Sequence, residues 1–199
     1  MDDMDINERI ARRVRDLRSE RGYSLDTLAE RSGVSRSSIS LIERAQTSPT
    51  ANVLDKLATA LDVTLASLFD EHARADAPPS PLARRADQPV WTDPGSGYVR
   101  RNLSPTQPSP LQLVEVQFPA GERVAYDTGV RENEVWQQIW VIEGTIEVAL
   151  DNIAWRLDSG DCLAMRLDQP IRFHNPTSVT ARYLVGLVTL PFVAPRRTP

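Results

Sequence analysis

A proline-rich segment divides this chain into two parts whose apolar residues follow different spacings. The segment, residues 71–89, reads EHARADAPPSPLARRADQP and has four prolines and almost no large apolar side chains. It cannot build a core of its own and is predicted to be an extended linker. Before it, apolar residues recur at intervals of three and four, which predicts helices. After it, runs rich in β-branched and aromatic residues predict strands at residues 144–150, 152–157 and 180–188.

These two patterns predict two domains of different class. We expect an all-α domain over residues 1–70, the linker over residues 71–89, and an all-β domain over residues 90–199. The five expected helices of the first domain lie at about residues 6–21, 25–32, 36–44, 51–61 and 65–69. A hydroxyl side chain that can accept a hydrogen bond from a helix N–H precedes each of the last four, at Ser24, Ser35, Thr50 and Thr64.

Composition argues against several classes of protein. The net charge of −4 does not suit a protein that coats nucleic acid or anionic membrane indiscriminately. No apolar run approaches the roughly 18 residues that span a bilayer, and the first residues lack the apolar core of a secretory signal, so we expect a cytoplasmic protein. Cys162 is the single cysteine and is expected to be a reduced thiol packed in a strand.

The local charge of the first domain differs from that of the whole chain. Residues 6–69 contain nine Arg and one Lys against eight Asp and Glu, a balance of +2. Arginines at positions 9, 12, 13, 15 and 18 are interpreted as a solvated helix face that pairs with Asp16 and Glu20 at helical spacing. The alternative is that Arg12 and Arg13 contact backbone phosphates of a nucleic acid.

Residues 25–44, LDTLAERSGVSRSSISLIER, have the spacing of two helices that cross at a steep angle. Ala29 leaves room for the second helix, and Gly33 can take a positive φ in the turn. The side chains expected in the shared core are Leu28, Val34, Ile39 and Ile42. From about Ile6 to Phe69 the sequence resembles the lambda repressor-like helix-turn-helix, the xenobiotic-response-element-like (XRE-like) family of bacterial regulators.

That resemblance implies that the start of the second helix of the motif enters the major groove of double-stranded DNA. Its exposed face has short or cationic residues and no acid before Glu43. Arg36 is the candidate for a bidentate contact with guanine, and Leu41 for a thymine methyl. Ser37 and Ser40 are expected at base edges, Ser24, Arg44 and Thr47 at phosphates, and Leu25 and Ser35 complete the predicted set.

Regulators of this type usually bind two-fold symmetric operators as dimers, so we expect a homodimer. Trp136 and Trp140, which alternate along one predicted strand, are candidates for the dimer interface. Burial of both rings inside a single barrel is the alternative that the sequence leaves open.

The second domain resembles the cupins, which are double-stranded β-helix (jelly-roll) barrels. The resemblance rests on IWVIEGTIEV with Gly144, on LDSGD with Gly160, and on Asn175-Pro176. In metal-binding cupins, three ligands come from the first of these motifs and one from the second. The corresponding positions here are Arg131, Asn133, Gln137 and Ile171.

Because Arg and Ile cannot ligate a metal, we expect no metal and no other cofactor. His174 is expected to point away from the barrel interior, and His72 is isolated in the linker. Arg131, Asn133 and Gln137 are instead predicted to hold a small anionic or carboxylate-bearing effector. The alternative is a barrel that serves dimerisation alone.

The sequence thus predicts a DNA-binding transcription regulator with a cupin-like effector domain, and not an enzyme. One alternative is an antitoxin-like repressor whose C-terminal domain captures a protein partner. Another is a cupin enzyme, which would need a metal centre or a paired acid and base.

Overall fold

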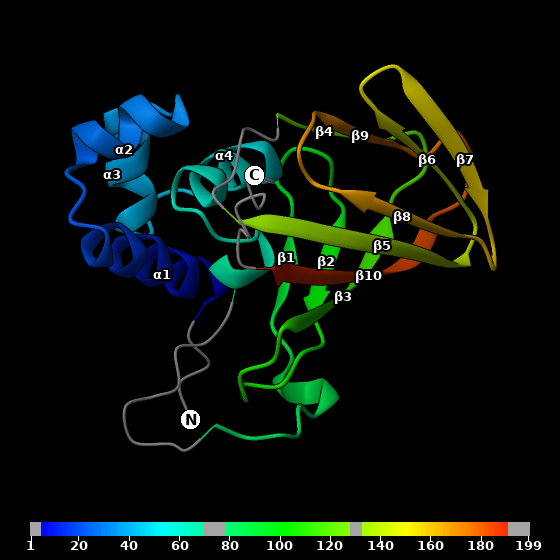
Figure 1. Cartoon of the computed structure of the whole chain (residues 1–199), viewed down its shortest axis with the longest axis horizontal. Helices are drawn as coiled ribbons and strands as arrows, with labels where there is room; N and C mark the ends of the chain where they lie inside the picture. The colour runs from blue at the N-terminus through cyan, green and yellow to red at the C-terminus, as the bar shows by residue number, and fades with distance from the viewer. Residues whose placement is uncertain (1–4, 70–78, 128–132, 191–199) are drawn as a thin grey trace, which may run out of the picture.

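The computed structural model describes residues 5–69, 79–127 and 133–190 of the chain. Figure 1 shows a group of helices beside a two-sheet barrel. The helices are α1 (Ile6–Glu20), α2 (Leu25–Ser32), α3 (Arg36–Glu43) and α4 (Ala51–Ala60), followed by the 3-10 turn η1 (Ala66–Leu68). The fifth expected helix is therefore a single 3-10 turn. No helix in these ranges has the length and apolar character needed to cross a bilayer.

The helix-turn-helix pair is built as its sequence predicts. Gly33 ends α2 with φ +68°, a left-handed conformation that suits glycine. Ser24 and Ser35 cap α2 and α3 by accepting hydrogen bonds from Thr27 N and Ser38 N. The four expected core residues, Leu28, Val34, Ile39 and Ile42, are buried.

Within the described residues ten strands follow, with the short 3-10 turn η2 (Arg85–Asp87) before them. The first five are β1 (Val90–Thr92), β2 (Val99–Asn102), β3 (Leu111–Phe118), β4 (Arg123–Tyr126) and β5 (Glu134–Glu143). The second five are β6 (Thr145–Leu150), β7 (Ile153–Asp158), β8 (Cys162–Arg166), β9 (Ile171–His174) and β10 (Ala181–Leu190). The three strands expected from the sequence correspond to β6, β7 and β10.

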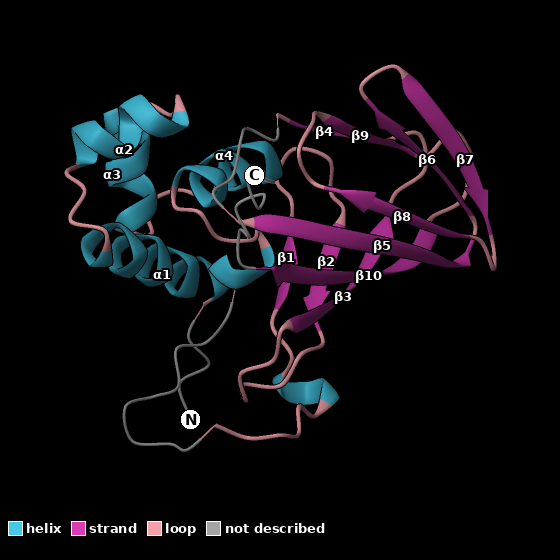
Figure 2. Ribbon diagram, in the orientation of Figure 1, coloured by secondary structure: helices cyan, strands magenta, loops and turns pink. Residues whose placement is uncertain are grey.

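The strands form two antiparallel sheets that face each other (Figure 2). One sheet has the order β1-β2-β3-β10-β5-β8, and the other has the order β4-β9-β6-β7. Leaving β1 and β2 aside, this alternation of eight strands between two sheets is the jelly roll of the cupins. The fold class is thus as predicted: an all-α helix-turn-helix domain followed by an all-β barrel.

Gly144 and Asn175, which are among the residues that resemble the cupin motifs, each have a clear structural role. Gly144 turns between β5 and β6 with φ +78°, and a Cβ there would lie 3.0 Å from Ala181 Cα and 3.1 Å from the Thr180 carbonyl oxygen. Asn175 is fully buried after β9, and its Nδ2 donates to the carbonyls of Phe118 and Val179. Both residues therefore fix the loops at the ends of the barrel strands.

The helix α4 packs against the open end of the barrel, between the other helices and the strands (Figure 1). Thr50 makes no capping bond to α4; Asp93, from the loop after β1, accepts the hydrogen bond of Ala51 N at 2.8 Å instead. Asn52 Nδ2 donates to the Ala125 carbonyl of β4. The buried apolar residues of the helices and the barrel form one continuous core.

Three expectations about single side chains are resolved. Trp136 and Trp140 lie on the outer face of β5 and are 45% and 49% exposed, so they are not buried within the barrel. Cys162 lies in a strand as expected, but it is exposed and not packed, because it follows the same outward alternation. His174 lies on the outer face of β9, where its Nδ1 meets Glu147 Oε2 at 2.9 Å.

Candidate functional site

The first candidate site is the exposed face of α3 and the start of α2. Ser24, Ser35, Ser37, Arg44 and Thr47 are exposed, and Leu25 and Ser40 are half-buried. Leu41 is 38% exposed, which is unusual for a leucine on a short helix with a buried face. The nine predicted DNA-binding residues therefore all come from one surface formed by two helices and their flanking loops.

Arg36 begins α3 and its Nε lies 3.1 Å from Asp26 Oδ1 of α2. The sequence of α3 alone does not indicate this partner, because Asp26 lies on the neighbouring helix. Both side chains are largely exposed, and such surface ion pairs contribute little free energy because solvent competes for both charges. Arg36 can therefore exchange Asp26 for another acceptor at small cost.

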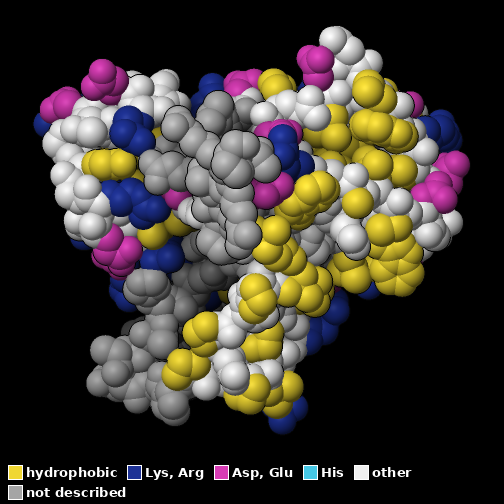
Figure 3. All heavy atoms as spheres, viewed as in Figure 1, with side chains coloured by type: hydrophobic (Ala, Val, Ile, Leu, Met, Phe, Trp, Pro, Cys, Tyr) yellow, Lys and Arg dark blue, Asp and Glu magenta, His cyan; other side chains and the backbone are white. Residues whose placement is uncertain are grey.

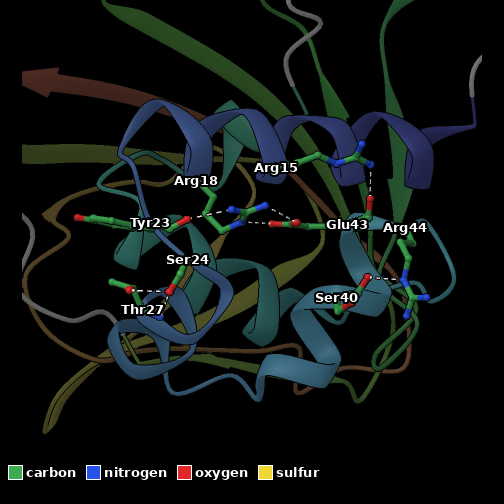
Figure 4. Close-up of polar contacts among 8 residues, drawn as sticks. All are labelled: Arg15, Arg18, Tyr23, Ser24, Thr27, Ser40, Glu43 and Arg44. Carbon is green, nitrogen blue, oxygen red and sulfur yellow. Dashed lines mark hydrogen bonds and ion pairs between the residues drawn. The ribbon is translucent and has the colours of Figure 1, made fainter.

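Arginines of α1 fix the orientation of α3 from the side opposite its exposed face (Figure 4). Arg18 donates from Nε and Nη2 to the two carboxylate oxygens of Glu43 at 2.6 and 2.8 Å, and Arg15 donates to the Glu43 carbonyl. The bond to Glu43 raises the pKa of Arg18. Glu43 is buried and its carboxylate is paired with Arg18, so no unpaired negative charge lies at the exposed face of α3.

These hydrogen bonds between α1 and α3 change the interpretation of the arginine run in α1. The run was expected to be a solvated face that pairs with Asp16 and Glu20 along the helix. Arg15 and Arg18 instead reach across to α3, and Arg13 Nε donates to the Ser67 carbonyl of η1. Sequence spacing within one helix could not indicate these long-range partners.

The second candidate site is a cavity of about 60 Å³ where α4 meets the inside of the barrel. Both domains line it: Asp55, Thr64 and Leu65 come from the helical side. The barrel contributes an apolar wall that includes Val116, Phe118, Leu167, Ile171, Phe173, Val185 and Leu187. Its polar part on the barrel side is made by Tyr98, Arg100, Tyr126, Gln137 and Tyr183.

Arg100 is the most unusual residue of this cavity. It lies on the inner face of β2 and only 7% of it is exposed. The guanidinium lies over the ring of Phe69, 5.5 Å from the centroid. Its Nε and Nη2 have no hydrogen-bond partner within the described part of the chain. A buried cation with two unused donors is costly, since removing charge from water must be offset by other contacts.

Three tyrosines surround this arginine in the cavity. Burial raises the pKa of Tyr98, Tyr126 and Tyr183 above the ordinary value. The nearby positive charge of Arg100 lowers the pKa of each, but burial is the larger effect. The hydroxyls of Tyr98 and Tyr126 lie 3.0 Å apart. All three side chains are therefore neutral hydrogen-bonding groups at physiological pH.

The predicted effector residues are only partly brought together. Gln137 lies on the inner face of β5 and lines the cavity, as does Ile171. Asn133 does not; its Nδ2 donates to Asp62 Oδ2 at 2.6 Å, which ties the barrel to the end of α4. Arg131 and His72 lie outside the described residues. Within those residues no cluster of three or more His, Cys, Asp or Glu could hold a metal ion.

Arg100, Tyr98 and Asp55 were not found from the sequence. The available signal was the alternation in YVRRN, residues 98–102, which puts positions 98, 100 and 102 on one face of a strand. The strand was not predicted, because a polar stretch with two adjacent arginines does not look like a buried β-strand. Its burial depends on α4 and η1 covering the inner face of the sheet.

Comparison with known proteins agrees with both domains. Residues 14–68 match the Helix-turn-helix family model. The HTH-type transcriptional regulator SinR of Bacillus subtilis is 46% identical over 63 residues, 31% of this chain and 57% of SinR. The chain thus spans little more than half the length of that relative. The HTH-type transcriptional regulator SutR of Escherichia coli is 28% identical over 174 residues, 85% of this chain and 89% of SutR.

A solved structure of a helix-turn-helix family transcriptional regulator from Vibrio cholerae has the same fold. It aligns with a TM-score of 0.73 and 24% identity over 94% of this chain and 98% of its own. Residues 14–68 are therefore a helix-turn-helix domain, and a jelly roll follows it in the chain. Over most of its length the chain is similar to SutR, an HTH-type transcriptional regulator.

Proposed function

We propose that this protein is a sequence-specific DNA-binding regulator that acts as a homodimer and responds to a small effector held in the barrel. The observation that carries the proposal of DNA binding is the exposed surface of α3. It presents Arg36, Ser37, Ser40 and Leu41 to solvent while its only acid, Glu43, is buried against Arg18. A helix with this face can approach the negative charge of DNA and offer hydrogen-bonding groups to base edges.

The homodimer is supported by the outer face of the larger sheet. Leu111 and Leu113 on β3 are exposed beside Trp136 and Trp140 on β5, with Gly186 of β10 between the two strands. We call these two leucines and two tryptophans the outer apolar patch. Figure 3 shows hydrophobic side chains gathered where these strands face the viewer. Aromatic residues are enriched in protein interfaces, and a two-fold axis lets one patch pair with its own copy.

Effector binding, and not catalysis, is the proposed role of the barrel. The cavity is mostly apolar with a few polar groups, as small-molecule sites usually are. Of the positions that hold metal ligands in cupin enzymes, the structure describes three, which are Asn133, Gln137 and Ile171. A cavity shared with α4 also favours an effector over capture of a protein partner, which would need an accessible surface.

The test is recovery of bound fragments from sheared genomic DNA of the source organism at about 0.15 M salt, where nonspecific phosphate contacts are weakened. We expect enrichment of a two-fold symmetric site. Arg36→Ala should weaken binding to that site by roughly 1–3 kcal/mol and relax the preference at one base. Arg156→Ala, which removes an exposed arginine from β7 of the barrel, is the matched control and should bind normally.

Two results would contradict the proposal. One is the absence of any enriched site both with and without cell extract as a source of effector. The other is an equal loss of affinity for all sequences in the Arg36→Ala variant, which would make that arginine a phosphate contact and not a base contact.

A further inference from the structure

The cavity between α4 and the barrel contains the guanidinium of Arg100, whose Nε and Nη2 have no hydrogen-bond partner among the described residues. Arg18, in the same chain, uses its Nε and Nη2 to hold both oxygens of the Glu43 carboxylate at 2.6 and 2.8 Å. Arg100 has the same two donors unused, although the residue is buried and lines the cavity. The planar guanidinium edge matches a carboxylate in shape as well as in charge.

We propose that Arg100 binds the carboxylate of a small monocarboxylic acid whose apolar tail lies against the inner wall of the barrel. The proposal deepens the effector role proposed above and rests on it for the biological outcome. It differs from the sequence prediction in its residues, because Arg100 on β2 takes the place expected for Arg131 and Asn133.

The other groups of the cavity narrow the class of ligand. The wall beyond Arg100 is apolar, with Val116, Phe118 and Phe173 among its residues, which suits a hydrocarbon or aromatic tail. A second ligand carboxylate would lie against this apolar wall, away from water, so dicarboxylates are disfavoured. The neutral Tyr98 and Tyr126 hydroxyls bond to each other, which leaves one O–H of the pair to donate to the bound carboxylate.

The position of the cavity lets a bound ligand affect the DNA-binding domain. Thr64 and Leu65, which follow α4, line the cavity, and Phe69 lies against the guanidinium of Arg100. These residues belong to the helical domain, while Arg100 belongs to the barrel. A ligand that binds there contacts both domains, so it stabilises one arrangement of the two over others.

The experiment measures thermal unfolding of the full chain with millimolar butanoate, hexanoate or benzoate, without DNA. At ten times its Kd, a fitting acid should raise the Tm by about 3–6 °C. The neutral amides of the same acids, succinate and inorganic phosphate should not. Arg100→Gln should weaken the affinity of the best acid, measured by calorimetry, by at least about tenfold. Arg101→Gln, on the opposite face of β2, is the control.

Three results would overturn the proposal. The first is that no monocarboxylate raises the Tm of the wild-type protein, and the second is that the amides do so equally well. The third is an unchanged affinity in Arg100→Gln. If that variant does not fold, the comparison of acids with amides in the wild-type protein still decides. Arg36→Ala should keep the response to the acid while its affinity for the operator falls, so a failure of DNA binding is distinguishable from a failure of ligand binding.

Discussion

Apolar side chains are usually buried and polar ones exposed, and the two faces of the larger sheet depart from this rule in opposite ways. On the outer face, Trp136 and Trp140 are about half exposed although they are large and apolar. On the inner face, Arg100 and Gln137 are buried although they are polar. An exposed apolar patch indicates a partner surface, whereas a buried polar set around a cavity indicates a ligand. The proposed homodimer surface and the proposed effector site thus use opposite faces of one sheet.

The largest expected effect is on the free energy of unfolding, and it tests whether the inner face of the larger sheet belongs to the hydrophobic core. Ile139 is fully buried on β5, between the two exposed tryptophans. Ile139→Ala should lower the free energy of unfolding by about 2–5 kcal/mol, because it leaves a cavity. Gln138→Ala, one residue away on the outer face, should change it by less than about 0.5 kcal/mol. Urea unfolding measures both, and equal effects would remove the distinction between the faces.

The next effect concerns the outer apolar patch. The double variant Trp136→Ser/Trp140→Ser should raise the dissociation constant of the dimer about 100-fold, since buried aromatics dominate interface energies. Sedimentation equilibrium at micromolar concentration measures this. Ile153→Ser is the control, because Ile153 is 60% exposed but lies on β7 in the other sheet. If Ile153→Ser dissociates the dimer and the double variant does not, the interface does not lie on the larger sheet.

A smaller effect concerns the tyrosines of the inner face. Burial raises the pKa of Tyr183, so the unfolded chain loses this proton near pH 10 while the folded chain keeps it. The stabilising contribution is present below that pH and falls as the pH rises further. Tyr183→Phe should reduce the loss of stability above pH 10 by up to about 1.4 kcal/mol per pH unit. Urea unfolding between pH 9 and about 11 checks this, and an unchanged slope would contradict the burial of the hydroxyl.

The smallest effect concerns the stability cost of Arg100. Arg100→Met replaces a buried cation with two unused donors by an apolar chain of similar length. In the absence of ligand, the free energy of unfolding should stay the same or rise by up to about 2 kcal/mol. A loss of several kcal/mol in chemical denaturation would show instead that Arg100 is held by strong contacts and has a structural role.

The sequence predicted the parts of this protein that depend on local signals. Caps, the turn glycine Gly33 and the 3.6-residue spacing specify α2 and α3 within a few residues, and Gly144 marks a tight barrel turn. The cavity could not be predicted in the same way. Arg100 is buried because η1 and Phe69, far away in the sequence, lie against β2. Asn133 was assigned to the effector site, yet it pairs with Asp62 across the domain interface.

The most direct test of the account is the structure of the protein bound to its selected operator. We expect two copies related by a two-fold axis, with the outer apolar patches against each other. The two α3 helices should lie in successive major grooves about one helical turn apart, with Arg36 at a guanine. A complex in which Trp136 and Trp140 stay exposed to solvent, or in which α3 does not enter the groove, would contradict it.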